Sequence, residues 1–434
     1  MTQSGSSEKL ELLFLLPEAG TFLALKYLIH KNHINGGINM FDFHFSIPTE
    51  IYFGRACERK AGALMKQHAD RVLLVYGSER IFRAENGQES LGAAIEADLQ
   101  AAGCRVFKMG GVKPNADTAY IRQAVKLVRD EKINGVLAVG GGSVIDSAKA
   151  VSAGSGFDGD IMELYTDPNA QPTAFLPVGA VVTLPATASE SNEMSVISDS
   201  ATGKKIARPF PQVKPKFALL DPALTLSVSP FQTASGGFDI FAHAFERYFD
   251  LNRKSSLLDR MTIALMQEVV DVLPKVLADP QNEALRGELM LAATVAHNDM
   301  LGPGGDFACH EMSHYITEAF GVAHGAALAM ILPAWCAYVS QKAPERFAEF
   351  FRQVFSIKEC QPEAVIEQGI AALEAFIDSL GLSRTLTAER ADRASLAEMA
   401  EKTMDGRSAI GWGTASLTSF DVAEIYERFI LPVA

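Results

Sequence analysis

The chain has 434 residues, with 39 Lys and Arg against 52 Asp and Glu, which gives a formal net charge of −13 at pH 7. This acidic balance argues against a protein that binds nucleic acid, because contact with phosphates requires clustered Lys and Arg. Hydrophobic residues make up 48% of the chain, which suffices for a globular core and excludes a disordered protein. The length predicts about two to three domains.

The cysteines indicate a reducing compartment. They are odd in number and scattered, without CxxC spacing: Cys57, Cys104, Cys309, Cys336 and Cys360. This pattern is typical of free thiols in a cytoplasmic protein. The apolar stretch at residues 10–29 is interrupted by Pro, Glu, Gly and Lys, whereas a membrane span needs about 20 nearly uninterrupted apolar residues. The start also lacks the features of a signal peptide. We therefore expect a cytoplasmic protein without membrane contact.

Residues 1–39 are predicted to be an extension outside the fold. A second methionine, Met40, opens a segment that has the pattern of a domain start. Chain termini are where disorder concentrates, so these residues are given no part in the mechanism.

Residues 40–221 are predicted to form an α/β dinucleotide-binding domain. Amphipathic helical stretches alternate with β-branched runs, which predict strands at 43–53, 71–76, 105–108, 135–139, 175–183 and 217–220. Residues 117–130 place Ile121, Ala124, Val125 and Val128 on one helix face. The wholly apolar runs at 72–75 and 136–139 are typical of strands buried on both faces. We expect a doubly wound, mostly parallel sheet.

Residues 222–434 are predicted to form an all-helical domain. Strand patterns almost vanish after Asp221 and Pro222, and helical patterns follow at 257–277, 282–301, 326–339, 344–354 and 362–380. No internal repeat or low-complexity tract is visible by eye.

The first stretch that carries chemistry is VGGGSVIDSAK at residues 139–149. It follows a buried strand and opens a helix, where glycines let the backbone approach a ligand and free N–H groups face a phosphate. It is neither the GxGxxG fingerprint nor a P-loop, and a purely structural turn is the alternative. A second, hydroxyl-rich stretch at 183–192 fits a capped loop as well as a binding segment.

Two further stretches contain potential metal ligands. Asp239 and His243 are four residues apart, so both point to one side of a helix, although a buried Asp–His hydrogen bond would explain the pair alone. His310, His314 and His324 fall within 15 residues, in a chain that has 9 histidines in all. Gly321 is expected to end one helix before the next begins. Imidazoles with a carboxylate suit Fe(II) or Zn(II), so this cluster predicts a metal site.

A zinc protease is a rival interpretation, because His310–Glu311–Met312–Ser313–His314 matches HExxH. The longer metzincin pattern fails, since Glu318 stands where its glycine would be and Gly321 where its third histidine would be. A protease would also leave the glycine loop and the Asp239/His243 pair unexplained.

Together these stretches resemble the iron-containing (group III) alcohol dehydrogenases, and within them the NADPH-dependent butanol dehydrogenase/aldehyde reductase branch. The similarity runs from about Phe41 to the C-terminus. It is carried by IPTEIYFGR at 47–55, the glycine loop, TLPATASESN at 183–192, LDPALT at 220–225, and the spacing of the Asp and His residues.

The resemblance implies roles for individual residues. Asp239, His243, His310 and His324 match four ligands of an Fe(II) ion, with Zn(II) possible. His314 matches a histidine near the nicotinamide and substrate. The matches to the cofactor site are Gly141, Gly142, Ser143 and Asp146 of the glycine loop, together with Thr183, Thr187 and Lys205. The family's members place the metal between an α/β and a helical domain, and a homodimer is expected.

The implied reaction is hydride transfer between NADP(H) and a short- to medium-chain aldehyde or alcohol, in which the metal polarises the oxygen and His314 passes a proton. Two alternatives remain open. A metal-dependent lyase of the dehydroquinate synthase type would need a basic substrate pocket, and the helices around the histidines are poor in Lys and Arg. A silent homologue would have no reason to keep four ligands.

The residues after the strand at 71–76 predict a preference for NADP(H) over NAD(H). An acidic residue at such a strand end binds the adenosine ribose and repels a 2′-phosphate. This chain has Gly77 and Ser78 there, followed by Glu79 and Arg80. Gly77 leaves room for the phosphate and Ser78 offers a hydroxyl, provided that Glu79 faces solvent. The alternative is a plain turn at the strand end.

Overall fold

The structure, a computed structural model, describes residues 43–84, 89–252, 255–389 and 391–432. The predicted extension at 1–39 therefore lies outside the described residues. Within them, no helix is long and apolar enough to cross a membrane.

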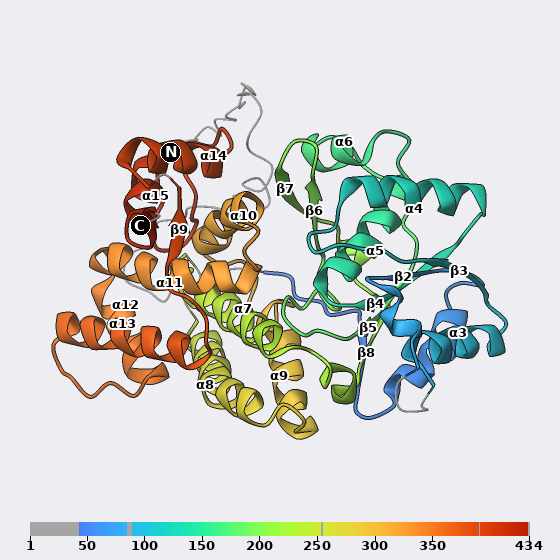
Figure 1. The fold of residues 1–434 in the computed structure, drawn as a ribbon, viewed down its shortest axis with the longest axis horizontal. Coiled ribbons are helices and arrows are strands. Elements are labelled where there is room, and N and C mark those ends of the chain that lie inside the picture. Colours follow the sequence, from blue (N-terminus) through green and yellow to red (C-terminus); the bar gives the residue numbers. More distant parts are fainter. Residues whose placement is uncertain (1–42, 85–88, 253–254, 390, 433–434) are drawn as a thin grey trace, which may run out of the picture. The chain divides into compact units, whose positions relative to one another are not determined.

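A parallel sheet organises the first half of the chain (Figure 1). Six described strands lie in the order β1-β8-β5-β4-β2-β3, and every neighbouring pair is parallel. Their bounds are β1 Glu50–Phe53, β2 Arg71–Tyr76, β3 Arg105–Met109, β4 Gly135–Gly140, β5 Val178–Val182 and β8 Phe217–Leu220. These strands confirm the predicted fold class. The first predicted strand is shorter than expected, because residues 43–49 do not join the sheet.

Helices cover both faces of this sheet, and alternate strand residues fill two separate cores. Leu73, Val75, Val136 and Ala138 point to one core, whereas Val72, Leu74, Leu137 and Val139 point to the other. The helices of this half are α2 Ala61–Lys66, α3 Leu91–Ala101, α4 Thr118–Asp130, α5 Gly142–Ser155 and α6 Ile161–Thr166. Burial on both faces explains why these strands are apolar throughout.

An antiparallel hairpin after β5 was not predicted. It consists of β6 Met194–Asp199 and β7 Lys204–Pro209. Its second strand contains two lysines, an arginine and a proline, and is half-exposed, so it lacks the apolar run of the buried strands. The hairpin carries Lys205, one of the predicted cofactor residues.

The second half of the chain is mostly helical, as predicted. Its helices are α7 Pro230–Tyr248, α8 Ser256–Ala278, α9 Glu283–Ala296, α10 Ala308–Phe320, α11 His324–Val339, α12 Pro344–Val354, α13 Pro362–Ser379, α14 Arg393–Met404 and α15 Ser419–Tyr426. The expectation of an all-helical part needs one correction, because β9 Leu386–Ala388 pairs in parallel with β10 Ile430–Pro432. Strands of three residues are too short to give a pattern in the sequence. The predicted boundary at Asp221 and Pro222 stays a prediction.

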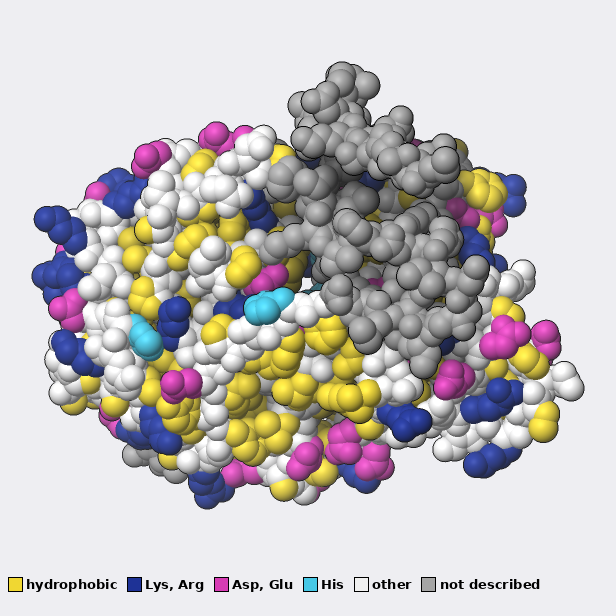
Figure 2. Space-filling view, turned by 180° about the vertical axis from the view of Figure 1, so that it is seen from behind, with side chains coloured by type: hydrophobic (Ala, Val, Ile, Leu, Met, Phe, Trp, Pro, Cys, Tyr) yellow, Lys and Arg dark blue, Asp and Glu magenta, His cyan; other side chains and the backbone are white. Residues whose placement is uncertain are grey.

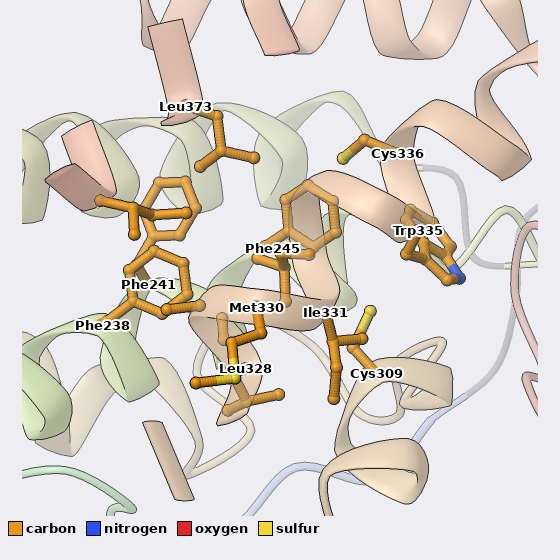
Figure 3. Packing of buried hydrophobic residues seen from close by; sticks show 14 of the residues in the cluster. Phe238, Phe241, Phe245, Cys309, Leu328, Met330, Ile331, Trp335, Cys336 and Leu373 are labelled. Carbon is orange, nitrogen blue, oxygen red and sulfur yellow. The ribbon is translucent and has the colours of Figure 1, made fainter. Parts of the chain in front are cut away.

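Helix α7 is the centre of the helical core. Phe238, Phe241 and Phe245 lie on it and are fully buried (Figure 3). Phe245 packs with Trp335 of α11, and both Phe241 and Phe245 pack with Phe350 of α12. The helix begins at the N-cap Ser229 with Pro230 in its first turn, an arrangement that fixes where the helix starts. Aromatic packing on both sides therefore holds α7 in one position.

Charged side chains on the exterior are mixed in sign. On the face that Figure 2 shows, Lys and Arg are interspersed with Asp and Glu. Hydrophobic side chains also reach the surface, among them Phe43, Phe45, Ile51 and Phe53 in and just before the edge strand β1.

Gly325 allows α11 to approach the backbone of α7. A Cβ atom at this position would lie 1.9 Å from the Ser235 carbonyl oxygen. We expect Gly325→Ala to lower the free energy of unfolding by about 1–3 kcal/mol, because the clash is with backbone. Gly287→Ala on α9 is the matched control, since its nearest neighbours, at 3.1 and 3.3 Å, are side-chain atoms. Urea unfolding of both variants is the measurement, and equal stability of the parent and Gly325→Ala would contradict the packing argument.

Candidate metal and nucleotide site

Asp239, on α7, is the centre of a buried polar cluster. Its carboxylate lies in a helix that is otherwise packed among aromatic side chains. His243 follows one turn later on the same face, as predicted, and its Nδ1 donates to the Asp239 backbone carbonyl at 2.8 Å. Burial lowers the pKa of His243 to about 4, so this imidazole is neutral.

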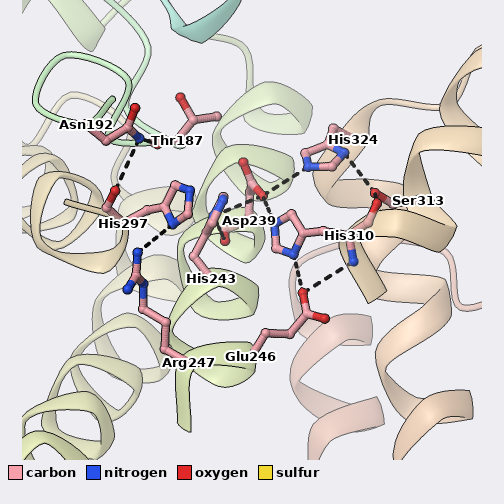
Figure 4. Close-up of polar contacts among 10 residues, drawn as sticks. All are labelled: Thr187, Asn192, Asp239, His243, Glu246, Arg247, His297, His310, Ser313 and His324. Carbon is pink, nitrogen blue, oxygen red and sulfur yellow. Dashed lines mark hydrogen bonds and ion pairs between the residues drawn. The ribbon is translucent and has the colours of Figure 1, made fainter. Parts of the chain in front are cut away.

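Three helices bring possible ligand atoms together (Figure 4). Asp239, His310 of α10 and His324 of α11 each offer one atom, and these atoms lie within 4.8 Å of one another. Nε2 of His310 and Nε2 of His324 are each 3.6 Å from Asp239 Oδ1. The chain reverses between the two histidines at Gly321, which ends α10 with a φ of 65°. Gly321 therefore ends the helix as predicted.

The cluster has the charge and spacing that a divalent cation needs. Oδ1 of Asp239 and Nε2 of His310 are buried, and neither has a hydrogen-bond partner among the described residues. Leaving such atoms unpaired is costly unless something else satisfies them. Two atoms bound at about 2.1 Å to one tetrahedral ion lie roughly 3.4 Å apart. The observed 3.6 Å separations are close to this distance.

Glu246, which the sequence analysis missed, fixes the orientation of His310. Its carboxylate contacts His310 Nδ1 and also accepts the backbone N–H of Cys309 at 2.7 Å. Burial alone would lower the pKa of His310, but the carboxylates of Glu246 and Asp239 raise it to about 9. Glu246 lies seven residues after Asp239 on the same helix face, and this spacing was the signal available in the sequence.

Ser313 fixes the orientation of His324, as Glu246 fixes that of His310. Its hydroxyl donates to the His310 backbone carbonyl at 2.7 Å and lies 3.1 Å from His324 Nδ1. Because that hydroxyl has one proton, Nδ1 of His324 must be the donor in the second contact. Nε2 of each histidine is then the atom left for a cation, which would replace the Nε2 proton of His310, and this is the usual arrangement for metal-binding imidazoles.

His243 and His314 lie beside this cluster. The ring of His243 is 4.3 Å from that of His310, but no His243 atom belongs to the set within 4.8 Å. Its role as a fourth ligand therefore stays a prediction. The ring of His314 stacks on His324 at 5.8 Å, and burial keeps its pKa well below the usual value. Glu311 pairs with Arg407 at 2.8 Å, which disfavours a zinc-protease site.

Thr183 and Thr187 follow β5 and Lys205 lies on β7, whereas the other predicted cofactor residues lie at the carboxyl ends of two strands, β2 and β4. These strands are neighbours, and the chain order of the sheet reverses between them. Open α/β sheets bind their ligands at such a switch point. Gly77 and Ser78 follow β2, and the glycine loop follows β4. Glu79 is exposed, as the argument for NADP(H) assumes, and its carboxylate accepts a hydrogen bond from the Tyr76 hydroxyl at 2.7 Å. The preference for NADP(H) stays a prediction.

The glycine loop is also packed closely against the hydroxyl-rich segment. A Cβ on Gly142 would lie 2.7 Å from Thr187 Oγ1, and one on Gly141 would lie 3.0 Å from Leu184 Cβ. Thr183 donates its backbone N–H to the Gly140 carbonyl at 3.0 Å. Packing therefore accounts for part of the glycine requirement that the sequence analysis assigned to phosphate binding. Ser143 accepts the backbone N–H of Asn115 at 3.2 Å, and Lys205 lies 3.4 Å from Asn115 Oδ1.

Lys149, in the glycine-loop helix, joins these two segments through a buried network. Its ammonium group donates to Ser189 Oγ at 2.9 Å, Asn192 Oδ1 at 2.9 Å and the Met194 carbonyl at 2.8 Å. Ser189 donates in turn to Asp146 at 2.6 Å. Burial raises the pKa of Asp146 and lowers that of Lys149 to about 8. Asp146, predicted to contact the cofactor, thus contacts the neighbouring segment in the described structure.

Comparisons with known proteins agree with this architecture. A model of the iron-containing alcohol dehydrogenases matches residues 48–222, and a model of the C-terminal part of the same enzymes matches residues 233–430. The chain belongs to the iron-containing alcohol dehydrogenase family.

Several relatives of this iron-containing alcohol dehydrogenase align with more than four fifths of the chain. A probable NADH-dependent butanol dehydrogenase of Bacillus subtilis is 34% identical over 84% of this chain and 94% of its own. The NADPH-dependent aldehyde reductase YqhD of Escherichia coli is 33% identical over an alignment that covers 84% of this chain and 93% of YqhD. The crystal structure of an NADH-dependent butanol dehydrogenase A from Thermotoga maritima superposes on this chain with a TM-score of 0.82 and is 30% identical in sequence. The superposition covers 90% of this chain and 99% of the Thermotoga chain.

We expect Lys149→Met to lower the free energy of unfolding by about 1–3 kcal/mol, because it leaves buried acceptors without a donor. Lys126→Met is the control, since Lys126 is an exposed residue of α4 that pairs with Asp130 at the surface. The measurement is the stability of the two variants and of the parent, compared by thermal unfolding. A Lys149→Met protein as stable as the control would mean that the network does not hold the two segments.

Proposed function

We propose that this chain is a metal-dependent alcohol dehydrogenase that reduces short- to medium-chain aldehydes with NADPH. Membership of the iron-containing alcohol dehydrogenase family makes it an alcohol dehydrogenase or aldehyde reductase that uses a metal and a nicotinamide cofactor. The observation that carries the proposal is the unpaired buried oxygen of Asp239, which faces the Nε2 atoms of His310 and His324.

In this proposal Asp239, His310 and His324 hold Fe(II), with His243 as the fourth ligand and Zn(II) as a possible substitute. Carboxylate oxygens and imidazole nitrogens suit either ion. When bound, the metal acts as a Lewis acid on the carbonyl oxygen, and the nicotinamide supplies the hydride. Glu246 and Ser313 keep the two Nε2 lone pairs directed at the cluster. The aromatic packing around α7 prevents Asp239 from turning outward.

His314 is proposed to pass a proton between solvent and the substrate oxygen. It is half-buried and stacked on His324, so it touches both the cluster and the solvent-accessible side of the site. The lowered pKa keeps the ring neutral, and a neutral imidazole can donate one proton while it accepts another. The predicted homodimer is part of the same proposal.

Replacement of single histidines separates metal binding from proton transfer. We expect His310→Ala to lose both the bound metal and turnover. His314→Ala should keep the metal but slow turnover by about 10²–10⁴-fold, the usual contribution of a general acid–base group. Elemental analysis and NADPH oxidation with butanal are the measurements, and the exposed His68→Ala is the control. Metal retained at parental levels in His310→Ala, or lost from His314→Ala, would contradict the assignment.

The NADP(H) preference depends on the space beside Gly77. A Cβ there would make only ordinary contacts, 3.7 Å from the Val112 carbonyl and 3.9 Å from Val144, so an aspartate fits without strain. We expect the parent to favour NADPH and Gly77→Asp to shift the preference toward NADH, because the carboxylate repels the 2′-phosphate.

Gly77→Ala is the control for this shift, since it adds the Cβ without the charge. The measurement is kcat/KM for both cofactors with one aldehyde. A parent that favours NADH would contradict the proposed preference, and so would an unchanged preference in Gly77→Asp.

A further inference from the structure

His297, which the sequence analysis did not single out, is positioned next to the metal cluster. It directly follows α9, and its side chain is half-buried. Its ring lies beside that of His243 (Figure 4), 4.4 Å away. The ring of Phe307 meets it edge-on at 5.6 Å. His297 therefore lies directly beside His243, the proposed fourth ligand of the metal.

His297 is held at both its backbone and its ring. Asn192 donates from Nδ2 to the His297 backbone carbonyl at 3.2 Å, and Arg247 donates from Nη2 to His297 Nδ1 at 2.9 Å. Arg247 is itself buried and fixed by contacts with Asp299 and the Gly302 carbonyl. The imidazole thus has little freedom to rotate.

These contacts determine where the proton of His297 lies. A guanidinium group can only donate, so Nδ1 must accept and the single proton of the neutral ring is on Nε2. Among the described residues, no group accepts a hydrogen bond from this Nε2. In Figure 4 the nitrogen points away from Arg247, toward the space between Thr187 and Asp239. The Nε2–H group of His297 is therefore a hydrogen-bond donor with a fixed orientation next to the cluster, and no described residue accepts its hydrogen bond.

We propose that His297 determines substrate specificity by donating a hydrogen bond from Nε2 to a second oxygen of the substrate. This inference rests on the proposed function, because it is the carbonyl bound at the metal cluster that brings the rest of the substrate beside His297. The class of substrate selected is a hydroxyaldehyde, and in the reverse direction a diol. An alkyl aldehyde of the same length would remove water from the N–H group without replacing its hydrogen bond, which is unfavourable.

The test compares propanal with 2-hydroxypropanal and 3-hydroxypropanal, which differ from it by one hydroxyl group. The proteins are the parent, His297→Leu, His297→Gln, and the exposed-site control His68→Leu. Leu removes the donor at similar size, and Gln restores an N–H group. kcat/KM is measured with NADPH for each aldehyde. The affinity of the metal-loaded enzyme for 1,2-propanediol, 1,3-propanediol and 1-propanol is measured by calorimetry.

We expect the parent to favour at least one hydroxyaldehyde over propanal, and the matching diol over 1-propanol. In His297→Leu each of these ratios should fall about tenfold, the effect of one lost hydrogen bond. His297→Gln should recover part of the ratio, and His68→Leu should keep all of it.

Ratios that are equal in the parent and in His297→Leu overturn the inference while leaving the proposed function intact, provided that the parent reduces propanal. Loss of metal from His297→Leu, measured by elemental analysis, also overturns it, because His297 would then support the metal instead of the substrate. A metal-loaded parent that reduces none of the three aldehydes overturns both the inference and the proposed function.

Discussion

The rest of the site depends on one constraint, which is that the carboxylate of Asp239 is buried without a hydrogen-bond donor for Oδ1 among the described residues. A charge in such a position requires a positive partner, since an isolated buried carboxylate is strongly unfavourable. The nearest candidates are imidazoles, and Glu246 adds a second negative charge behind His310. Asp239 and Glu246 thus flank His310 from two sides, and a divalent cation at the cluster would balance the charge of Asp239.

The cofactor side is coupled to this cluster through hydrogen bonds. Lys149 connects the glycine-loop helix to Asn192, and Asn192 donates to both the Thr187 and the His297 carbonyls. Thr294 of α9 also donates to the buried Glu190 at 2.7 Å. The segment at 183–194 therefore touches the glycine loop on one side and the helices beside the metal cluster on the other. In the proposed function this segment would hold the cofactor side and the metal side of the site at a fixed separation.

Much of this arrangement could be predicted from the sequence, because the strongest patterns are local. The apolar strands, the glycine loop and the i, i+4 spacing of Asp239 and His243 each follow from neighbouring residues. The contributions of His297 and Lys149 could not be predicted, since each depends on contact with residues from a distant part of the chain. For Glu246 the sequence offered its spacing from Asp239, but not its contact with His310, which is 64 residues away in the chain. The hairpin of β6 and β7 was missed because its polar strand resembles a loop. The individual metal and cofactor roles stay predictions.

Asp239→Asn tests the central claim most directly, because it removes the charge and keeps the size of the side chain. The measurement is the metal content of anaerobically purified parent and variant, together with NADPH oxidation by butanal before and after chelation and addition of Fe(II). The account predicts one metal per parent chain, activity that chelation abolishes and Fe(II) restores, and neither metal nor activity in Asp239→Asn. A variant that binds one metal per chain and reduces butanal like the parent would contradict it.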